Sequence, residues 1–138
     1  MPACCRLTLS NQLTAIADTM RQVEQFMTSH RISNAAVPAA LLALEESLVN
    51  IVTHGFNDDR LHFITVDVTL SDKQIALEIT DDGIPFDPIS LPPPDRSAPL
   101  EARPIGGLGV WLTKQMMTDM RYRREDERNK LFLLKEWA

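Results

Sequence analysis

The stretch that decides the fold is residues 41–56, which read LLALEESLVNIVTHGF. Apolar residues recur there at helical spacing and predict one apolar face: Leu41, Leu44, Leu48 and Ile51. A polar row follows the same period on another face: Glu46, Asn50 and His54. A buried carboxylate or amide needs a partner, which is either another part of the fold or a ligand with its metal. On this helix alone the first interpretation is favoured, because single helical motifs often arise by chance.

The composition describes a chain of the size of one domain. Its 138 residues are 44% hydrophobic, enough to bury a core without disulfides or a second domain. We find no apolar run long enough to span a membrane and no secretory signal, so we expect a cytoplasmic protein. The net charge of -5 argues against nucleic-acid or anionic-membrane binding. The adjacent Cys4 and Cys5 cannot close a distant loop, and we interpret them as free thiols.

The rest of the chain predicts helices combined with antiparallel strands. In chain order we expect a strand at residues 6–9, helices at 13–27 and 38–55, strands at 64–70 and 75–79, a helix from Leu108 and a closing pair of strands around Tyr122 and 131–134. The apolar face expected for the third helix consists of Leu108, Leu112, Met116 and Met120. This order predicts an α+β fold, a two-layer α/β sandwich with helices on one face of a mixed, mostly antiparallel sheet.

Two further stretches carry chemistry. The second strand of the hairpin leads into DDGIPFDP, residues 81–88, and GGLG, residues 106–109, opens the third helix. Unpaired backbone N–H groups and the helix dipole at such a glycine turn favour an anion such as phosphate; the alternatives are a flexible hinge or close helix packing. No Gly-Lys-Ser/Thr follows, which excludes a P-loop, and Leu112 stands where a dinucleotide fingerprint has its third glycine.

A proline-rich loop separates the two stretches. Prolines recur from residue 85 to residue 104, so neither a helix nor a strand can run through this segment. A loop of this length in a compact domain is typical of a lid, a binding loop or a disordered segment.

Taken together, three motifs resemble the boxes of the Bergerat-fold ATPases, the superfamily of gyrase B, Hsp90, histidine kinases and MutL. They are Glu46-x-x-x-Asn50, Asp81-x-Gly83-x-Pro85 and Gly107-x-Gly109. The stretches EESLVNIVTHGF, DDGIPFDP and GGLGVWL resemble more closely the small anti-sigma factor serine-protein kinases of bacterial partner-switching systems. The resemblance covers nearly the whole chain. It implies a single histidine-kinase-like ATPase domain, residues 1–138, with an ATP lid at about residues 86–104.

The resemblance also implies roles for the polar row of the central helix. Glu46 would be the general base that orients or deprotonates the attacking hydroxyl. Asn50 would supply a side-chain oxygen to Mg²⁺, whose other ligands would be phosphate oxygens and water. His54 would line the nucleotide pocket as a structural residue.

The two glycine motifs receive roles from the same resemblance. Asp81 would accept a hydrogen bond from the adenine amino group, which makes the site select adenine over guanine. Gly83 would let the backbone approach the base. Gly107, Leu108 and Gly109 would bind the phosphates through main-chain N–H groups.

The function implied by the resemblance is phosphoryl transfer from ATP, with Mg²⁺, to a serine or threonine of a STAS-type anti-sigma factor antagonist. In its ATP-bound state such a domain would also sequester a sigma factor or another regulatory target. The alternative is a non-catalytic ATP-binding switch module that sequesters the same targets. We expect no direct contact with nucleic acid or membrane, and the resemblance leaves open whether the chain forms a homodimer.

Overall fold

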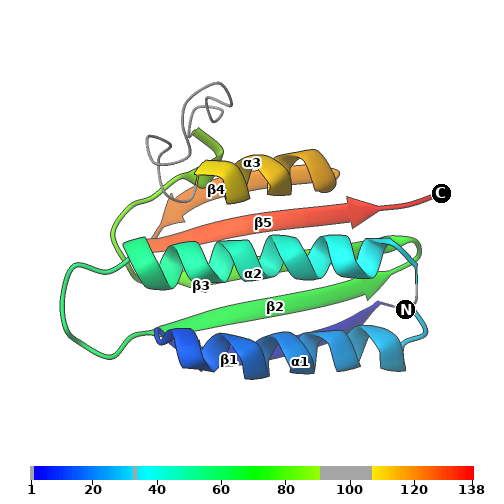
Figure 1. Cartoon of the computed structure of the whole chain (residues 1–138), viewed down its shortest axis with the longest axis horizontal. Helices are drawn as coiled ribbons and strands as arrows, with labels where there is room; N and C mark the ends of the chain where they lie inside the picture. Colours follow the sequence, from blue (N-terminus) through cyan, green and yellow to red (C-terminus); the bar gives the residue numbers. More distant parts are fainter. Residues whose placement is uncertain (1, 33, 91–106) are drawn as a thin grey trace.

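The computed structural model describes residues 2–32, 34–90 and 107–138 (Figure 1). The strands are β1 (Ala3–Ser10), β2 (Phe63–Ser71), β3 (Gln74–Asp81), β4 (Asp119–Glu125) and β5 (Arg128–Glu136). The helices are α1 (Leu13–Ser29), α2 (Ala36–His54), α3 (Gly107–Met116) and the single 3-10 turn η1 (Pro88–Ser90). Most of the expected lid lies outside the described residues.

The five strands form one sheet in the order β1-β2-β3-β5-β4. Helices α1, α2 and α3 lie side by side across one face of this sheet, with α2 in the middle (Figure 1). This arrangement confirms the expected α+β sandwich. All four described pairings are antiparallel, where a mixed sheet was expected. The reason is that the β4–β5 hairpin places β5 next to β3 and antiparallel to it. Strand β4, which follows α3 in the chain, then lies at the edge of the sheet.

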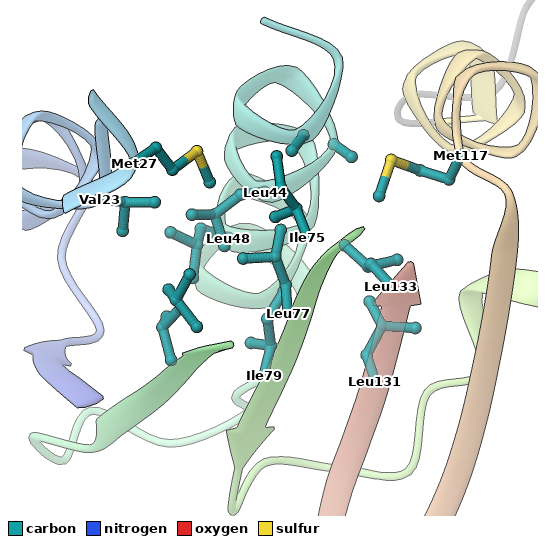
Figure 2. Packing of buried hydrophobic residues seen from close by; sticks show 14 of the residues in the cluster. Val23, Met27, Leu44, Leu48, Ile75, Leu77, Ile79, Met117, Leu131 and Leu133 are labelled. Atoms are coloured by element: carbon teal, nitrogen blue, oxygen red, sulfur yellow. The ribbon is translucent and has the colours of Figure 1, made fainter. Parts of the chain in front are cut away.

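The core lies between the sheet and the helices. Alternate residues of β2, β3 and β5 point toward the helices and are buried, as their period-two pattern predicts. Figure 2 shows Val23 and Met27 of α1 and Leu44 and Leu48 of α2 packed over Leu77 of the sheet. All five side chains are fully buried, so α1, α2 and the middle of the sheet share one continuous apolar core.

The bounds of α1 and α2 agree closely with those expected from the sequence, whereas those of β1 do not. Strand β1 is longer than expected and buries Leu9 on its inner side. Helix α2 begins at Ala36, which places Pro38 in its first turn, where a missing backbone N–H costs nothing. The last residue of the helix is His54, and Gly55 caps it. The N–H of Gly55 donates to the carbonyl of Ile51 at 2.8 Å.

The prediction of the apolar face of the third helix was wrong. Helix α3 ends at Met116, and Met120 belongs to strand β4. Leu112 is 37% exposed, whereas Val110 and Thr113 are buried. At about 100° per residue, Leu112 stands roughly 100° from Thr113 and 160° from Val110 around the helix, so the buried positions belong to a different face from the one expected.

Helix α2 corrects a second expectation. Among the described residues, α2 is the one helix that is both long enough and apolar enough to cross a membrane, judged by length and composition alone. Its apolar residues are, however, packed against the sheet and the neighbouring helices, as in the core helix of a folded domain. The helix therefore gives no indication of a membrane protein.

Candidate functional site

A pocket opens between α2, α3 and the ends of β3 and β5. Its empty volume is about 520 Å³, open solvent at the mouth included. Its walls consist of Glu46, Ser47, Asn50, Ile51, Gly55, Asp81, Phe86, Pro88, Val110, Thr113, Met120, Tyr122, Asn129 and Leu131. Glu46 and Asn50 of α2 and Asp81 at the end of β3 therefore meet in one place, although they are about thirty residues apart in the sequence.

Glu46 and Asn50 face this pocket without protein partners. Asn50 is 8% exposed and Glu46 is half-buried, and within the described residues neither the Asn50 amide nor the Glu46 carboxylate forms a hydrogen bond or ion pair, so both are open to the pocket. Ser47, on the same helix, is satisfied by a 2.7 Å bond to the carbonyl of Ala43. Buried polar groups in folded proteins are normally hydrogen-bonded. An amide and a carboxylate left open on a pocket wall fit a polar ligand, and their oxygens suit a hard cation such as Mg²⁺.

The start of α3 packs directly against Glu46. A Cβ atom built on Gly109 would lie 2.1 Å from Oε2 of Glu46, so any side chain at position 109 would displace the carboxylate. Gly107, Leu108 and Gly109 form the first turn of α3. The first N–H groups of a helix have no partner within it and carry the positive end of the dipole. The structure therefore brings the first turn of α3, whose N–H groups could bind an anion, next to the Glu46 carboxylate of α2.

Asp81 closes the other side of the pocket. It is 3% exposed, and its Oδ1 accepts hydrogen bonds from the backbone N–H of Gly83 at 2.8 Å and from Nδ2 of Asn129 at 3.0 Å. Burial raises the pKa of Asp81 above its usual value, and these two hydrogen bonds oppose the shift. Both hydrogen bonds reach the same oxygen, so within the described residues Oδ2 has no protein donor and remains free to accept a hydrogen bond from a ligand.

Gly83 contacts the end of α2. A Cβ atom at this position would lie 2.1 Å from the carbonyl oxygen of Gly55, and the next N–H, that of Ile84, donates to the same oxygen at 2.8 Å. The guanidinium of Arg124 donates to the carbonyl of Gly83 at 2.7 Å. In the structure the need for glycine at residue 83 thus comes from the approach of two backbone segments. This contact holds the segment that follows Asp81 against the end of α2.

Asn129 is a site residue that the sequence analysis did not identify. It is the second residue of β5, is 5% exposed and lies opposite Asp81 in the register of β3 and β5. Only that register could have revealed it. Its Oδ1 accepts from the hydroxyl of Tyr122 at 2.5 Å, and Tyr122 also lines the pocket.

Two residues of α2 that stand near Glu46 and Asn50 in the sequence lie away from the pocket. His54 is exposed at the end of α2 and is not part of the pocket wall, so its predicted role has no support in the geometry of the described residues. Glu45 is exposed and borders a groove between α1 and α2 on the other side of the helix. Of the two adjacent acids, Glu46 is therefore the one that faces the candidate site.

The described start of the expected lid lies at the pocket. Phe86 and Pro88 are part of its wall. Asp87 caps the short turn η1 by accepting from the N–H of Ile89 at 2.9 Å, and Lys114 of α3 donates to the carbonyl of Ile89 at 2.5 Å. Residues 91–104 of that expected lid are outside the described chain.

A second polar cluster lies beside the site. The imidazole of His62 contacts Asp58 at 2.7 Å and Asp82 at 3.0 Å and stacks on Phe56, with ring centroids 4.4 Å apart. The hydrogen bond to Asp58 raises the pKa of His62, burial opposes this, and the bond to Asp82 adds to the rise. The cluster fastens the loop after α2 to the end of β3, next to Asp81.

Comparisons with known proteins agree with this geometry. A family model described as a histidine kinase-like ATPase domain matches residues 9–135. The chain is 28% identical to the serine/threonine-protein kinase BtrW of Bordetella bronchiseptica over 127 residues, 92% of this chain and 89% of BtrW.

A second relative matches a shorter part. The serine-protein kinase RsbW of Bacillus cereus is 30% identical over 89 residues, which are 62% of this chain and about half, 55%, of RsbW. Among solved structures, the RsbU and RsbW domains of Rv1364c from Mycobacterium tuberculosis align with a TM-score of 0.70 at 15% identity, covering 97% of this chain and 32% of that one. This last likeness supports the fold.

Proposed function

The chain belongs to the histidine kinase-like ATPase domain family, and we propose that it is an ATP-dependent serine/threonine protein kinase. It acts as an anti-sigma factor in a bacterial partner-switching system and phosphorylates a STAS-type antagonist protein. The relatives that are named serine/threonine-protein kinase and serine-protein kinase support the reaction. The observation that carries the proposal is the meeting of Glu46 and Asn50, both without protein partners, with the glycine start of α3.

Each wall of the pocket binds one part of the nucleotide in this proposal. Asp81 accepts a hydrogen bond from the adenine amino group through Oδ2. The N–H groups of Gly107, Leu108 and Gly109 bind the phosphates, as the start of a helix favours. Asn50 is the residue that would hold Mg²⁺, which would neutralise phosphate charge when it is bound with ATP. The segment at about residues 86–104 acts as the lid over the nucleotide.

Glu46 acts on the protein substrate. The hydroxyl oxygen of the acceptor serine or threonine forms a bond to the γ-phosphorus, the bond from that phosphorus to the β-γ bridging oxygen breaks, and ADP leaves. Glu46 takes the hydroxyl proton. Such transfer depends chiefly on positioning and charge stabilisation, and Glu46 is positioned by its packing on Gly109.

The partners follow from the same proposal. The ATP-bound domain sequesters a sigma factor or another regulatory target, and phosphorylation of the antagonist decides which partner is held. We further propose a cytoplasmic location, where both partners would be found.

The test compares two adjacent carboxylates. Glu46→Gln removes the proposed base, while Glu45→Gln makes the same change on the opposite side of α2. We expect phosphate transfer from ATP to a purified STAS-type antagonist to fall by about 10²- to 10⁴-fold in the first variant only. Calorimetry should find ATP affinity retained in both.

Each outcome of this test has one meaning. Transfer at the wild-type rate by Glu46→Gln would contradict the assignment of the base. ATP binding without any transfer by the wild-type protein would favour the alternative, a non-catalytic ATP-binding switch module. Loss of MgATP binding in Asn50→Ala, with the fold retained, is expected if Asn50 holds the metal.

A further inference from the structure

Asn129 connects four segments of the site through one amide group. Its Nδ2 donates to Oδ1 of Asp81 at 3.0 Å and to the carbonyl of Ile84 at 2.8 Å. Its Oδ1 accepts from the hydroxyl of Tyr122 at 2.5 Å and from the N–H of Phe86 at 3.4 Å. An asparagine side chain has two donor hydrogens and one acceptor oxygen with two lone pairs, so its full capacity is used.

Two backbone groups fix the orientation of this amide. The N–H of Phe86 can only donate, and the carbonyl of Ile84 can only accept. If the amide were turned over, its NH₂ would face a donor and its oxygen would face an acceptor. The NH₂ group of Asn129 therefore has to point at Asp81, and no rearrangement of the side chain alone can remove this donor.

This orientation divides the two oxygens of Asp81 between two tasks. Oδ1 receives two N–H groups, from Gly83 and Asn129, so it has to act as an acceptor and cannot carry a proton. The proton of a neutral Asp81 would therefore sit on Oδ2, the oxygen that has no protein donor among the described residues. Oδ2 is thus an acceptor when Asp81 is ionised and a donor when it is not.

The surroundings of Asp81 oppose its ionisation. Burial is the largest cause that raises its pKa, and the neighbouring carboxylate of Asp82 on the same segment adds to it. Glu46 of α2 lines the same pocket and is a further negative group. The opposing groups are Asn129, the N–H of Gly83 and the guanidinium of Arg124 on β4. The hydrogen bond from Asn129 is the largest of these three.

On the basis of the proposed nucleotide site, we propose that Asn129 is a positioning residue that keeps Asp81 ionised, with Oδ2 as a pure acceptor, and thereby makes the site select adenine over guanine. An ionised Oδ2 accepts a hydrogen bond from the amino group of adenine. At the same place guanine presents a carbonyl oxygen, which an ionised carboxylate repels and a protonated one would bind. The choice of base is therefore tied to the protonation of Asp81, and Asn129 controls that protonation.

The experiment measures ATP and GTP affinity by calorimetry across a pH series in steps of ~0.5 unit, from the ordinary pKa of an aspartate, about 4, upward, because the pKa of Asp81 is raised. Asn129→Asp has the same shape but replaces the donor with a second carboxylate beside Asp81. We expect the pH at which ATP affinity is half lost to rise by about one unit or more, which is about a tenfold weaker ATP affinity at the lower pH values. The ratio of ATP to GTP affinity should fall with it, and ATP affinity should recover at high pH.

The control makes the same chemical change elsewhere. Asn34→Asp is at the start of α2, where Oδ1 of Asn34 accepts from the N–H of Ala36 at 2.8 Å, a bond that aspartate keeps. It adds one negative charge without touching the site, so both the pH profile and the ATP to GTP ratio should equal those of the wild-type protein. If Asn129→Asp does not fold, Asn129→Ala removes the donor without adding charge and should shift the profile in the same direction.

The outcomes separate this inference from the proposed function. A wild-type protein that binds no ATP would overturn the proposed function. A wild-type protein that binds ATP selectively, together with Asn129 variants that lose affinity equally at every pH and keep the same base preference, would overturn the inference alone. Asn129 would then only hold the loop around Ile84 and Phe86 in place.

Discussion

Helix α2 lies between α1 and α3, and its contacts on the two sides differ in polarity. Toward α1 it packs fully buried apolar side chains, Leu44 and Leu48 against Val23 and Met27 (Figure 2). Toward α3 it presents Glu46 and Asn50, which have no protein partners among the described residues. The same helix therefore supplies stability on one side and binding groups on the other.

The difference separates the side of α2 that packs the core from the side that lines the candidate site. Apolar burial on the α1 side stabilises the fold at roughly 25 cal/mol per Å². On the α3 side, Glu46 and Asn50 line an open pocket and contribute no hydrogen bond to another described residue, and Asp81 is buried enough for its pKa to rise. We expect changes on the first side to alter folding and changes on the second to alter binding or transfer. The predictions below test this division.

The largest effect on stability is expected from Met27→Ala on the α1 side. Met27 is 0% exposed, and truncation of a buried methionine typically costs about 2–5 kcal/mol because it leaves a cavity. Urea unfolding should show this loss, while ATP affinity measured below the unfolding transition stays within about threefold of the wild-type value. A strong loss of ATP affinity in the folded variant would contradict the division.

Gly83→Ala should combine both effects. The new methyl group would meet the carbonyl oxygen of Gly55 at 2.1 Å, and two backbone segments joined by a hydrogen bond cannot easily separate. Overpacking of this kind costs about 1–3 kcal/mol. Thermal unfolding should register the loss, and ATP affinity should fall because Asp81 moves with the loop.

Gly109→Ala is the matched change on the same pocket. Here the new methyl group would meet the far end of a flexible side chain, Oε2 of Glu46, which can rotate away. Stability should change by less than about 1 kcal/mol, since alanine is a good helix former. Phosphate transfer should fall at least about 10²-fold, because the base is displaced. Equal destabilisation by the two glycine variants would show that Glu46 is fixed as rigidly as backbone.

Asp81→Asn should weaken binding and strengthen the fold. Loss of the charged acceptor should reduce ATP affinity by about 10- to 100-fold. The folded pKa of Asp81 is raised, so ionisation costs the native state stability. That cost is absent below the unfolded pKa near 4, grows as pH rises toward the folded pKa and is constant above it. The variant should therefore have the higher midpoint of thermal unfolding at pH 7, and the two proteins should converge near pH 4.

The smallest effect concerns His62, at the margin of the site. Its side chain is 15% exposed, and its folded pKa is raised by Asp58 and Asp82. A raised folded pKa means that the stabilisation is complete below the unfolded value near 6.5 and is lost as pH rises through the folded pKa. The wild-type unfolding temperature should fall by a few degrees over that interval, and His62→Gln should not show this decrease. The same pH dependence in the variant would assign it to another group.

Local sequence pattern predicted the elements well. Period-two alternation located β2 and β3, and helical spacing located α1 and α2, because these periods follow from backbone geometry alone. It also placed Glu46 and Asn50 on one face, since a spacing of four residues is nearly one helical turn. The family resemblance, stated from the three motifs, agrees with the family model that matches residues 9–135.

Other site features could not be predicted from local pattern. Asn129 stands 48 residues after Asp81, and only the register of β3 and β5 makes them neighbours. The buried face of α3 depended on where that helix ends, and the position of His54 outside the pocket wall depended on how α2 lies across the sheet.

The sequence by itself therefore determined the order of elements, the polar row of α2 and the glycine motifs, because each of these is a property of neighbouring residues. The tertiary structure alone decided which oxygen of Asp81 is hydrogen-bonded by the protein, why residue 83 has to be glycine and which residue stands beside Asp81 in the candidate site. The physical reason is that hydrogen bonds and close contacts between distant segments depend on strand register and helix packing. Neither of these is encoded in any single stretch of the chain.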